Sequence, residues 1–181
     1  LGIFPTPGGK FVFVTFESSS RVALIDSESR QVARVYELGE GRPDSIAFSS
    51  QGHVAVVRFG SSLATYDHGA GALSLRDIAR DHVPATPGGR SPAALNRRGT
   101  RVYHSVDGGL GYFVVDGLSL FDTVDVDRSV ASWALAPDYR FLWGVAADRI
   151  VVVDERRGAV VGRVRGSFAT VAPVFVRTAG A

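Results

Sequence analysis

The sequence predicts an all-β fold built from four similar units. Three observations lead to this expectation: short apolar runs recur at a spacing near 40 residues, tight turns separate them, and no stretch shows the apolar period of an amphipathic helix. The chain has 181 residues, of which 45% are apolar, so it is long enough for one domain with a substantial core.

The clearest repeated element is an apolar run closed by an aspartate. The four aspartates lie 41, 49 and 38 residues apart and are Asp26, Asp67, Asp116 and Asp154. A β-rich run precedes each of them, at residues 11–16, 54–59, 101–106 and 141–146. Three of these runs follow a glycine turn, whereas the fourth follows Pro137-Asp138-Tyr139-Arg140. Each unit also has a shorter apolar segment before the turn and a further apolar segment after the aspartate. We therefore expect four strands in every unit.

A four-stranded antiparallel sheet of about 40 residues is one blade of a β-propeller. Runs such as Val151-Val152-Val153 are apolar on both faces, as a sheet packed between two others requires. We therefore predict a β-propeller with four blades of four-stranded antiparallel sheets, at residues 1–41, 42–89, 90–127 and 128–168. A β-sandwich of short strands is the alternative, but it predicts no such period.

The ring can close in three ways. Residues 169–181 are expected to hold a first strand, which either completes the first blade or opens a further blade of a seven- or eight-bladed ring. Alternatively, two chains associate and share an eight-bladed ring.

Composition excludes several classes of function. The net charge of +2 is spread evenly, which argues against a nucleic-acid binder. The absence of cysteine excludes disulfides, thiolate metal sites and haem attachment through C-x-x-C-H. No run of 18 apolar residues predicts a membrane span. The chain also lacks methionine, even at position 1, so it is either a processed chain or a fragment. Removal of a leader would fit a periplasmic or extracellular location.

The first unit resembles a known bacterial repeat. Its segments Phe11-Val12-Phe13-Val14-Thr15-Phe16, Arg21-Val22-Ala23-Leu24-Ile25-Asp26 and Gln31-Val32-Ala33-Arg34-Val35 resemble the YVTN-type propeller repeat, and the other units do so more weakly. That superfamily includes lactonase-like propellers, binding proteins of the periplasm and cell surface, amine dehydrogenase heavy chains and haem d1 propellers.

One segment, residues 46–67, is similar to the haem d1 group in particular. It departs from that group at Gly41-Arg42-Pro43-Asp44, where the resemblance implies a histidine, so no axial ligand is carried over.

Ligands are expected at the channel mouth, around the loops that enter each first strand and those between the second and third strands. These loops carry Arg42, Arg90 and Arg128 at comparable points of three units, where their guanidinium groups are placed to converge on a carboxylate. In the alternative interpretation they form salt bridges between blades with Asp44, Asp81 and Asp127.

Two histidines add to the candidate site. His82 lies in the long connection of residues 80–89, from which it can cap the channel. His104 occupies a strand position that the other units fill with Val14, Val57 and Gly144. An imidazole there is either a hydrogen-bonded core residue or a functional group.

The predicted site therefore comprises Arg42, Asp44, His82, Arg90, His104 and Arg128, with no catalytic residue and no metal ligand among them. No Gly-x-Ser-x-Gly motif or metal-binding spacing indicates an enzyme. The favoured function is a non-enzymatic scaffold that binds a small anionic ligand or a protein partner. The first alternative is a tetrapyrrole-binding propeller of the haem d1 type, with arginines on the propionates. A lactonase-like hydrolase is the weaker alternative.

Overall fold

The computed structural model describes residues 2–16, 18–38, 41–50, 52, 54–59, 62–69, 72–79, 93–106, 109–115, 119–126 and 130–168. Regular structure in these ranges consists of strands, which form four four-stranded antiparallel sheets. Over the same ranges, we find no helix with the length and apolar character needed to cross a membrane.

Each sheet is formed by four strands that follow one another along the chain. The first sheet contains β1 (Gly2–Pro5), β2 (Phe11–Thr15), β3 (Arg21–Asp26) and β4 (Val32–Glu37). The second contains β5 (Pro43–Phe48), β6 (Val54–Phe59), β7 (Ser62–Gly69) and β8 (Ala72–Ala79). The third contains β9 (Ala94–Leu95), β10 (Arg101–Val106), β11 (Gly109–Val114) and β12 (Ser119–Val124). The fourth contains β13 (Ser132–Leu135), β14 (Phe141–Val145), β15 (Arg149–Asp154) and β16 (Ala159–Arg165).

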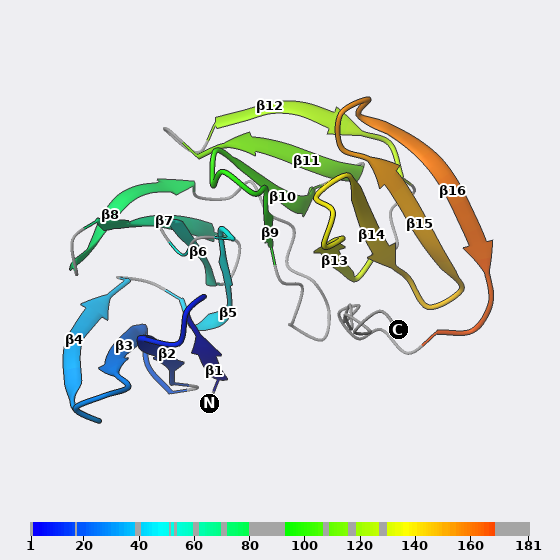
Figure 1. Cartoon of the computed structure of the whole chain (residues 1–181). Coiled ribbons are helices and arrows are strands. Elements are labelled where there is room, and N and C mark those ends of the chain that lie inside the picture. The colour runs from blue at the N-terminus through cyan, green and yellow to red at the C-terminus, as the bar shows by residue number, and fades with distance from the viewer. Residues whose placement is uncertain are drawn as a thin grey trace, which may run out of the picture.

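The four sheets succeed one another along an arc (Figure 1). Their first strands, β1, β5, β9 and β13, line the inner side, and their fourth strands, β4, β8, β12 and β16, lie outermost (Figure 1). Contacts between first strands link β1 to β5, β5 to β9 and β9 to β13. The predicted all-β architecture of four four-stranded blades is confirmed.

Three apolar cores lie between successive sheets. The first joins Phe13, Leu24 and neighbouring side chains of the first sheet to Val57 and Phe59 of the second. The second joins the opposite face of the second sheet to the third, and the third joins the third sheet to the fourth. All six residues of β6 are buried, because both faces of the second sheet are covered.

The turn between the first and second strands has the same form in all four sheets. In each turn, one backbone N–H donates to the carbonyl oxygen of the residue three positions earlier. The donor is Gly9 at 2.8 Å, Gly52 at 2.9 Å, Gly99 at 3.0 Å and Tyr139 at 2.8 Å. These residues have φ values of 70°, 73°, 68° and 58°, in the left-handed region that glycine adopts without strain. Tyr139 therefore takes the glycine position in the fourth sheet.

The third unit differs from its prediction. The first residue of each second strand pairs with Asp26, Asp67 and Asp154 in the other sheets, but with Val114 in the third. A bulge lies one to two residues before each of these positions. Val114, rather than Asp116, is thus the equivalent of the repeated aspartate, two residues earlier than the sequence pattern predicts. The aspartate does not mark this position in the third unit, because a continuous run of apolar residues gives no indication of which residue pairs with which across the sheet.

The repeated aspartate at the end of the third strand binds the turn that follows it. Asp26 Oδ1 accepts backbone N–H bonds from Glu28 at 3.0 Å and Ser29 at 2.8 Å. Asp154 Oδ1 likewise accepts from Arg156 at 3.0 Å and Arg157 at 3.2 Å. Each carboxylate thus satisfies the backbone donors of the turn that leads into the outermost strand.

Candidate functional site

The two ends of the sheets carry different connections. Those between first and second strands and between third and fourth strands lie at one end, which we call the turn end. Those between second and third strands, and from each sheet to the next, lie at the opposite end, which we call the loop end. The predicted ligand-binding loops belong to the loop end.

Arg42 lies at the loop end, between β4 and β5, and is exposed. The connection lies against the end of β6, since a Cβ atom added at Gly41 would be 3.2 Å from the ring of Phe59. Asp44 is the extra residue of a bulge between Pro43 and Ser45, where β5 joins β6. His82, Arg90 and Arg128 lie outside the described residues, so the convergence of the three arginines stays a prediction.

His104 is fully buried, with 0% of its surface exposed. It shares a face of β10 with Val102, which packs in the core between the second and third sheets. Its Nδ1 atom lies 2.8 Å from the carbonyl oxygen of Ser105, a hydrogen-bonding distance. The residue is therefore placed inside the seam between two blades, as the core interpretation of His104 expected, and not on an open surface.

Arg58 lies in the same seam and was missed by the sequence analysis. It is 2% exposed and shares a face of β6 with Val54 and Val56, which pack against the third sheet. A guanidinium group keeps its charge at physiological pH, so its burial requires polar groups around it. In the sequence, Arg58 stands out only as the one charged residue of the apolar run 54–59, which does not say which way it faces.

Thr65 adds a third buried polar group to this seam. It is 0% exposed and pairs across the sheet with Val56, so its side chain projects from the same face as Arg58. Among the residues that the structure describes, its hydroxyl oxygen has no hydrogen-bond partner. Buried hydroxyls without a hydrogen-bond partner are uncommon. A ligand or an ordered water molecule can supply the missing hydrogen bond.

The seam between the third and fourth sheets is closed by polar contacts near the loop end. The indole N–H of Trp133 donates to Ser105 Oγ at 2.9 Å, and that hydroxyl donates to the carbonyl of Val130 at 3.2 Å. Gly144 makes room for the Trp133 ring, since an added Cβ would lie 2.6 Å from it.

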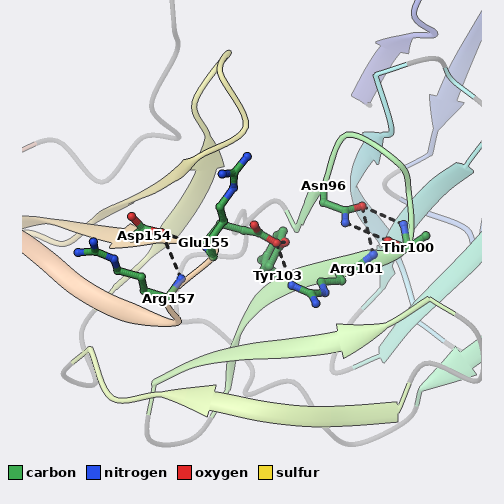
Figure 2. A network of polar contacts seen from close by, with 8 residues as sticks. Asn96, Thr100, Arg101, Tyr103, Asp154, Glu155 and Arg157 are labelled. Carbon is green, nitrogen blue, oxygen red and sulfur yellow. Dashed lines mark hydrogen bonds and ion pairs between the residues drawn. The ribbon is translucent and has the colours of Figure 1, made fainter.

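At the turn end, a charged network joins the same two sheets (Figure 2). Glu155 Oε1 accepts hydrogen bonds from the Tyr103 hydroxyl at 2.6 Å and from Arg101 Nη1 at 3.0 Å. Asp154, beside it, is 3.6 Å from Arg140 Nε. Burial would raise the pKa of Asp154, but the N–H bonds from Arg157 and Arg156 outweigh burial and hold the pKa below its ordinary value.

Tyr112 lies beside this network without joining it. Its ring meets the Tyr103 ring edge to face, with centroids 5.1 Å apart. Its hydroxyl is buried and has no hydrogen-bond partner in the described part of the chain. Burial is the main cause that raises the pKa of Tyr112 to about 12, with the charge of Glu155 adding to it. For Tyr103, burial and then the bond to Glu155 raise the pKa.

No acidic or histidine cluster marks a metal centre in the described ranges: no three side chains of that kind gather where they could hold an ion. Besides the Trp133–Ser105 contacts, two groups of described polar residues lie between the sheets. One is the seam of Arg58, Thr65 and His104, and the other is the network at the turn end, where the charges are paired with one another.

With this geometry in place, the chain can be compared with known proteins. No protein-family model matches it, and no curated protein does. Among solved structures, hydrazine synthase of Kuenenia stuttgartiensis is similar, with a TM-score of 0.73 over 91% of this chain and 48% of that chain. The fold is that of a β-propeller. This chain spans about half the length of the similar chain, and the two sequences are 15% identical, so the likeness shows the fold and not the activity.

Proposed function

We propose that this chain is a non-enzymatic propeller scaffold that binds a small anionic ligand at its loop end, in the periplasm or outside the cell. The observation that carries the proposal is the pair of guanidinium groups in the second sheet. Arg42 is exposed beside the end of β6, and Arg58 is buried in the last part of that strand. Arginine suits a carboxylate or phosphate because its planar group binds two oxygens at once.

Several described arginines at both ends are already paired with acidic side chains. At the turn end, Arg101 and Arg140 are paired with Glu155 and Asp154. At the loop end, Arg149 is paired with Asp148 and Arg21 with Glu37. The YVTN resemblance fits a binding role, because that superfamily contains binding propellers.

The tetrapyrrole alternative gains no support from the described residues. It required His104 or His82 to approach a macrocycle. His104 lies between two sheets with 0% of its surface exposed, so a flat ring cannot reach it unless the sheets separate. His82 lies outside the described residues.

The proposal is tested by thermal unfolding with phosphate or succinate as the probe, at constant ionic strength maintained with chloride. We expect a saturable rise in Tm, because a ligand that binds only the folded state stabilises it by mass action. Arg42→Ala should weaken the rise, whereas Arg156→Ala should preserve it. Arg156 is a matched control, since it is an exposed arginine at the turn end. A rise without saturation, or equal losses in both variants, would contradict the proposal.

A further inference from the structure

The turns between first and second strands in the third and fourth sheets carry three exposed arginines. Arg97 and Arg98 lie between β9 and β10, and Arg140 lies between β13 and β14. The two turns contact each other, since the guanidinium group of Arg97 lies over the ring of Tyr139, with its central carbon 5.9 Å from the ring centroid. We call Arg97, Arg98, Tyr139 and Arg140 the arginine–tyrosine patch, and it lies at the turn end.

Tyr139 occupies its position in this patch with a strained backbone. Its φ of 58° is in the left-handed region, where the equivalent residue of each other sheet is glycine. The side chain is half-buried and is not part of the core between the third and fourth sheets. A strained residue at such a position indicates that its side chain has a use of its own.

The turn that carries Arg97 and Arg98 is fixed by hydrogen bonds. Asn96 Oδ1 accepts the backbone N–H groups of Thr100 at 2.8 Å and Arg101 at 3.2 Å (Figure 2). The hydroxyl of Ser50, from the corresponding turn of the second sheet, donates to the carbonyl oxygen of Arg97 at 3.0 Å. A partner therefore meets side chains that start from fixed backbone positions, which lowers the entropy that binding loses.

Positive charge in the patch exceeds the negative charge beside it. Neither Arg97 nor Arg98 forms an ion pair with an acidic side chain of the described residues. Arg140 has such a partner in Asp154, at 3.6 Å. The carboxylate of Asp138, in the turn of Tyr139, accepts the backbone N–H of Arg140 at 3.0 Å. Two guanidinium groups beside an aromatic ring therefore remain for a partner.

The composition of the patch fits an acidic protein partner. Arginine and tyrosine are among the side chains that most often carry the binding energy of protein interfaces. Guanidinium groups bind carboxylates through paired hydrogen bonds, and an aromatic ring packs against apolar groups. We propose that the arginine–tyrosine patch binds an acidic segment of a protein partner, with carboxylates on Arg97 and Arg98 and an apolar side chain on the ring of Tyr139. This surface is separate from the anion site proposed at the loop end.

Acidic side chains around the patch favour a protein segment over a nucleic acid. Asp138 lies in the same turn as Tyr139, and Asp154 and Glu155 lie where β15 leads into the next turn of that sheet. A nucleic acid carries one phosphate charge at each nucleotide of a strand, so a strand that extends beyond the patch meets these carboxylates. A protein segment carries charge only where its sequence places it.

Fluorescence anisotropy tests the proposal on the folded 181-residue chain. The probe is a labelled peptide that has a leucine between two tetraglutamate segments. We expect saturable binding that weakens as the salt concentration rises, because exposed charges are screened. The same peptide with tetraglutamine segments should not bind, and a labelled single-stranded DNA octamer should bind more weakly than the acidic peptide.

Substitutions locate the binding surface. The double variant Arg97→Ala and Arg98→Ala should weaken binding about tenfold, since it removes two charge-assisted contacts. Tyr139→Gly should also weaken it, and circular dichroism should show a folded chain, because glycine is the residue of the other three turns. Arg34→Ala is the matched control: Arg34 is exposed on the outermost strand of the first sheet, with its guanidinium group 5.4 Å from the ring centroid of Tyr36. This variant should bind the peptide as the unsubstituted chain does.

Arg42→Ala separates this proposal from the anion site at the loop end, and it too should leave the affinity for the peptide unchanged. Loss of binding in Arg42→Ala, with none in the double variant, would overturn the proposed docking surface and leave the proposed function standing. The absence of saturable binding, equal binding of the glutamine peptide, or tighter binding of the DNA octamer would also overturn the proposal.

Discussion

The aspartates that end the third strands act locally on the turn that follows them. The backbone N–H bond from Ser29 is the main cause that lowers the pKa of Asp26, and the bonds from Arg157 and Arg156 do the same work at Asp154 against the effect of burial. Both carboxylates are therefore held in the ionised form that accepts these bonds. Asp26 and Asp154 therefore stabilise the turns that follow them.

Two neighbouring tyrosines allow the polar contacts at the turn end to be tested separately from packing. Tyr103→Phe removes the donor to Glu155 and should lower the free energy of unfolding by about 1–2 kcal/mol, since hydrogen bonds to charged groups are the stronger ones. Tyr112→Phe removes a buried hydroxyl without a described partner and should leave stability unchanged or raise it by up to about 1 kcal/mol. Urea unfolding of both variants measures the difference.

Because the two rings contact each other, each variant serves as the packing control for the other. A Tyr103→Phe variant that is no less stable than the unsubstituted chain would show that the hydrogen bond from Tyr103 to Glu155 contributes nothing to stability. That result would contradict the assignment of the Glu155 network.

The candidate site shows where residue-level prediction succeeds and where it stops. The position of His104 among apolar neighbours was readable, because the repeat aligns it with Val14, Val57 and Gly144. The importance of Arg58 was not recognised, because a single charged residue in a strand looks the same whether it faces solvent or a neighbouring sheet. Only the packing of the third sheet on Val54 and Val56 reveals that Arg58 is buried.

At the scale of the element, the turns between first and second strands were the most predictable feature. Glycine and the residues around it specify a left-handed position, and three of the four units show it in sequence. The register of the third strands was less predictable. A bulge recurs in every sheet, and a continuous apolar run gives no indication of which residue lies opposite which.

Two turn glycines separate backbone strain from contact between blades. Gly9 and Gly99 have nearly the same φ, 70° and 68°. A Cβ at Gly9 would meet nothing within 4 Å, whereas at Gly99 it would lie 2.9 Å from Val54 of the preceding sheet. Gly9→Ala should cost about 1–2 kcal/mol from the left-handed backbone alone. Gly99→Ala should cost about 1–3 kcal/mol more, because the seam is overpacked.

Thermal or urea unfolding compares these two variants in the same background. If Gly99→Ala were no more destabilising than Gly9→Ala, the turn of the third sheet would not be packed against the second. The close contact between Gly99 and Val54 of the second sheet would then be contradicted.

At the scale of the whole molecule, the fold was predictable because its logic is repetitive. Each sheet is apolar on both faces and needs a neighbour on each side, which only a serial arrangement provides. The function was less predictable for the same reason: the residues that repeat are those that build the blades, and a binding site depends on the residues that do not. Arg58 has no charged counterpart in the other units, where Thr15, Ser105 and Val145 occupy its position, so the repeat gives no indication of its role.

The central claim is that successive sheets pack flank to flank in series. The most direct measurement is a nuclear Overhauser spectrum of the folded chain that covers the outer seams. We predict cross-peaks between the rings of Phe13 and Phe48, whose centroids are 5.2 Å apart, and between the indole N–H of Trp133 and the side chain of Ser105. Cross-peaks that instead joined the first sheet to the third, with none at these two seams, would contradict the account.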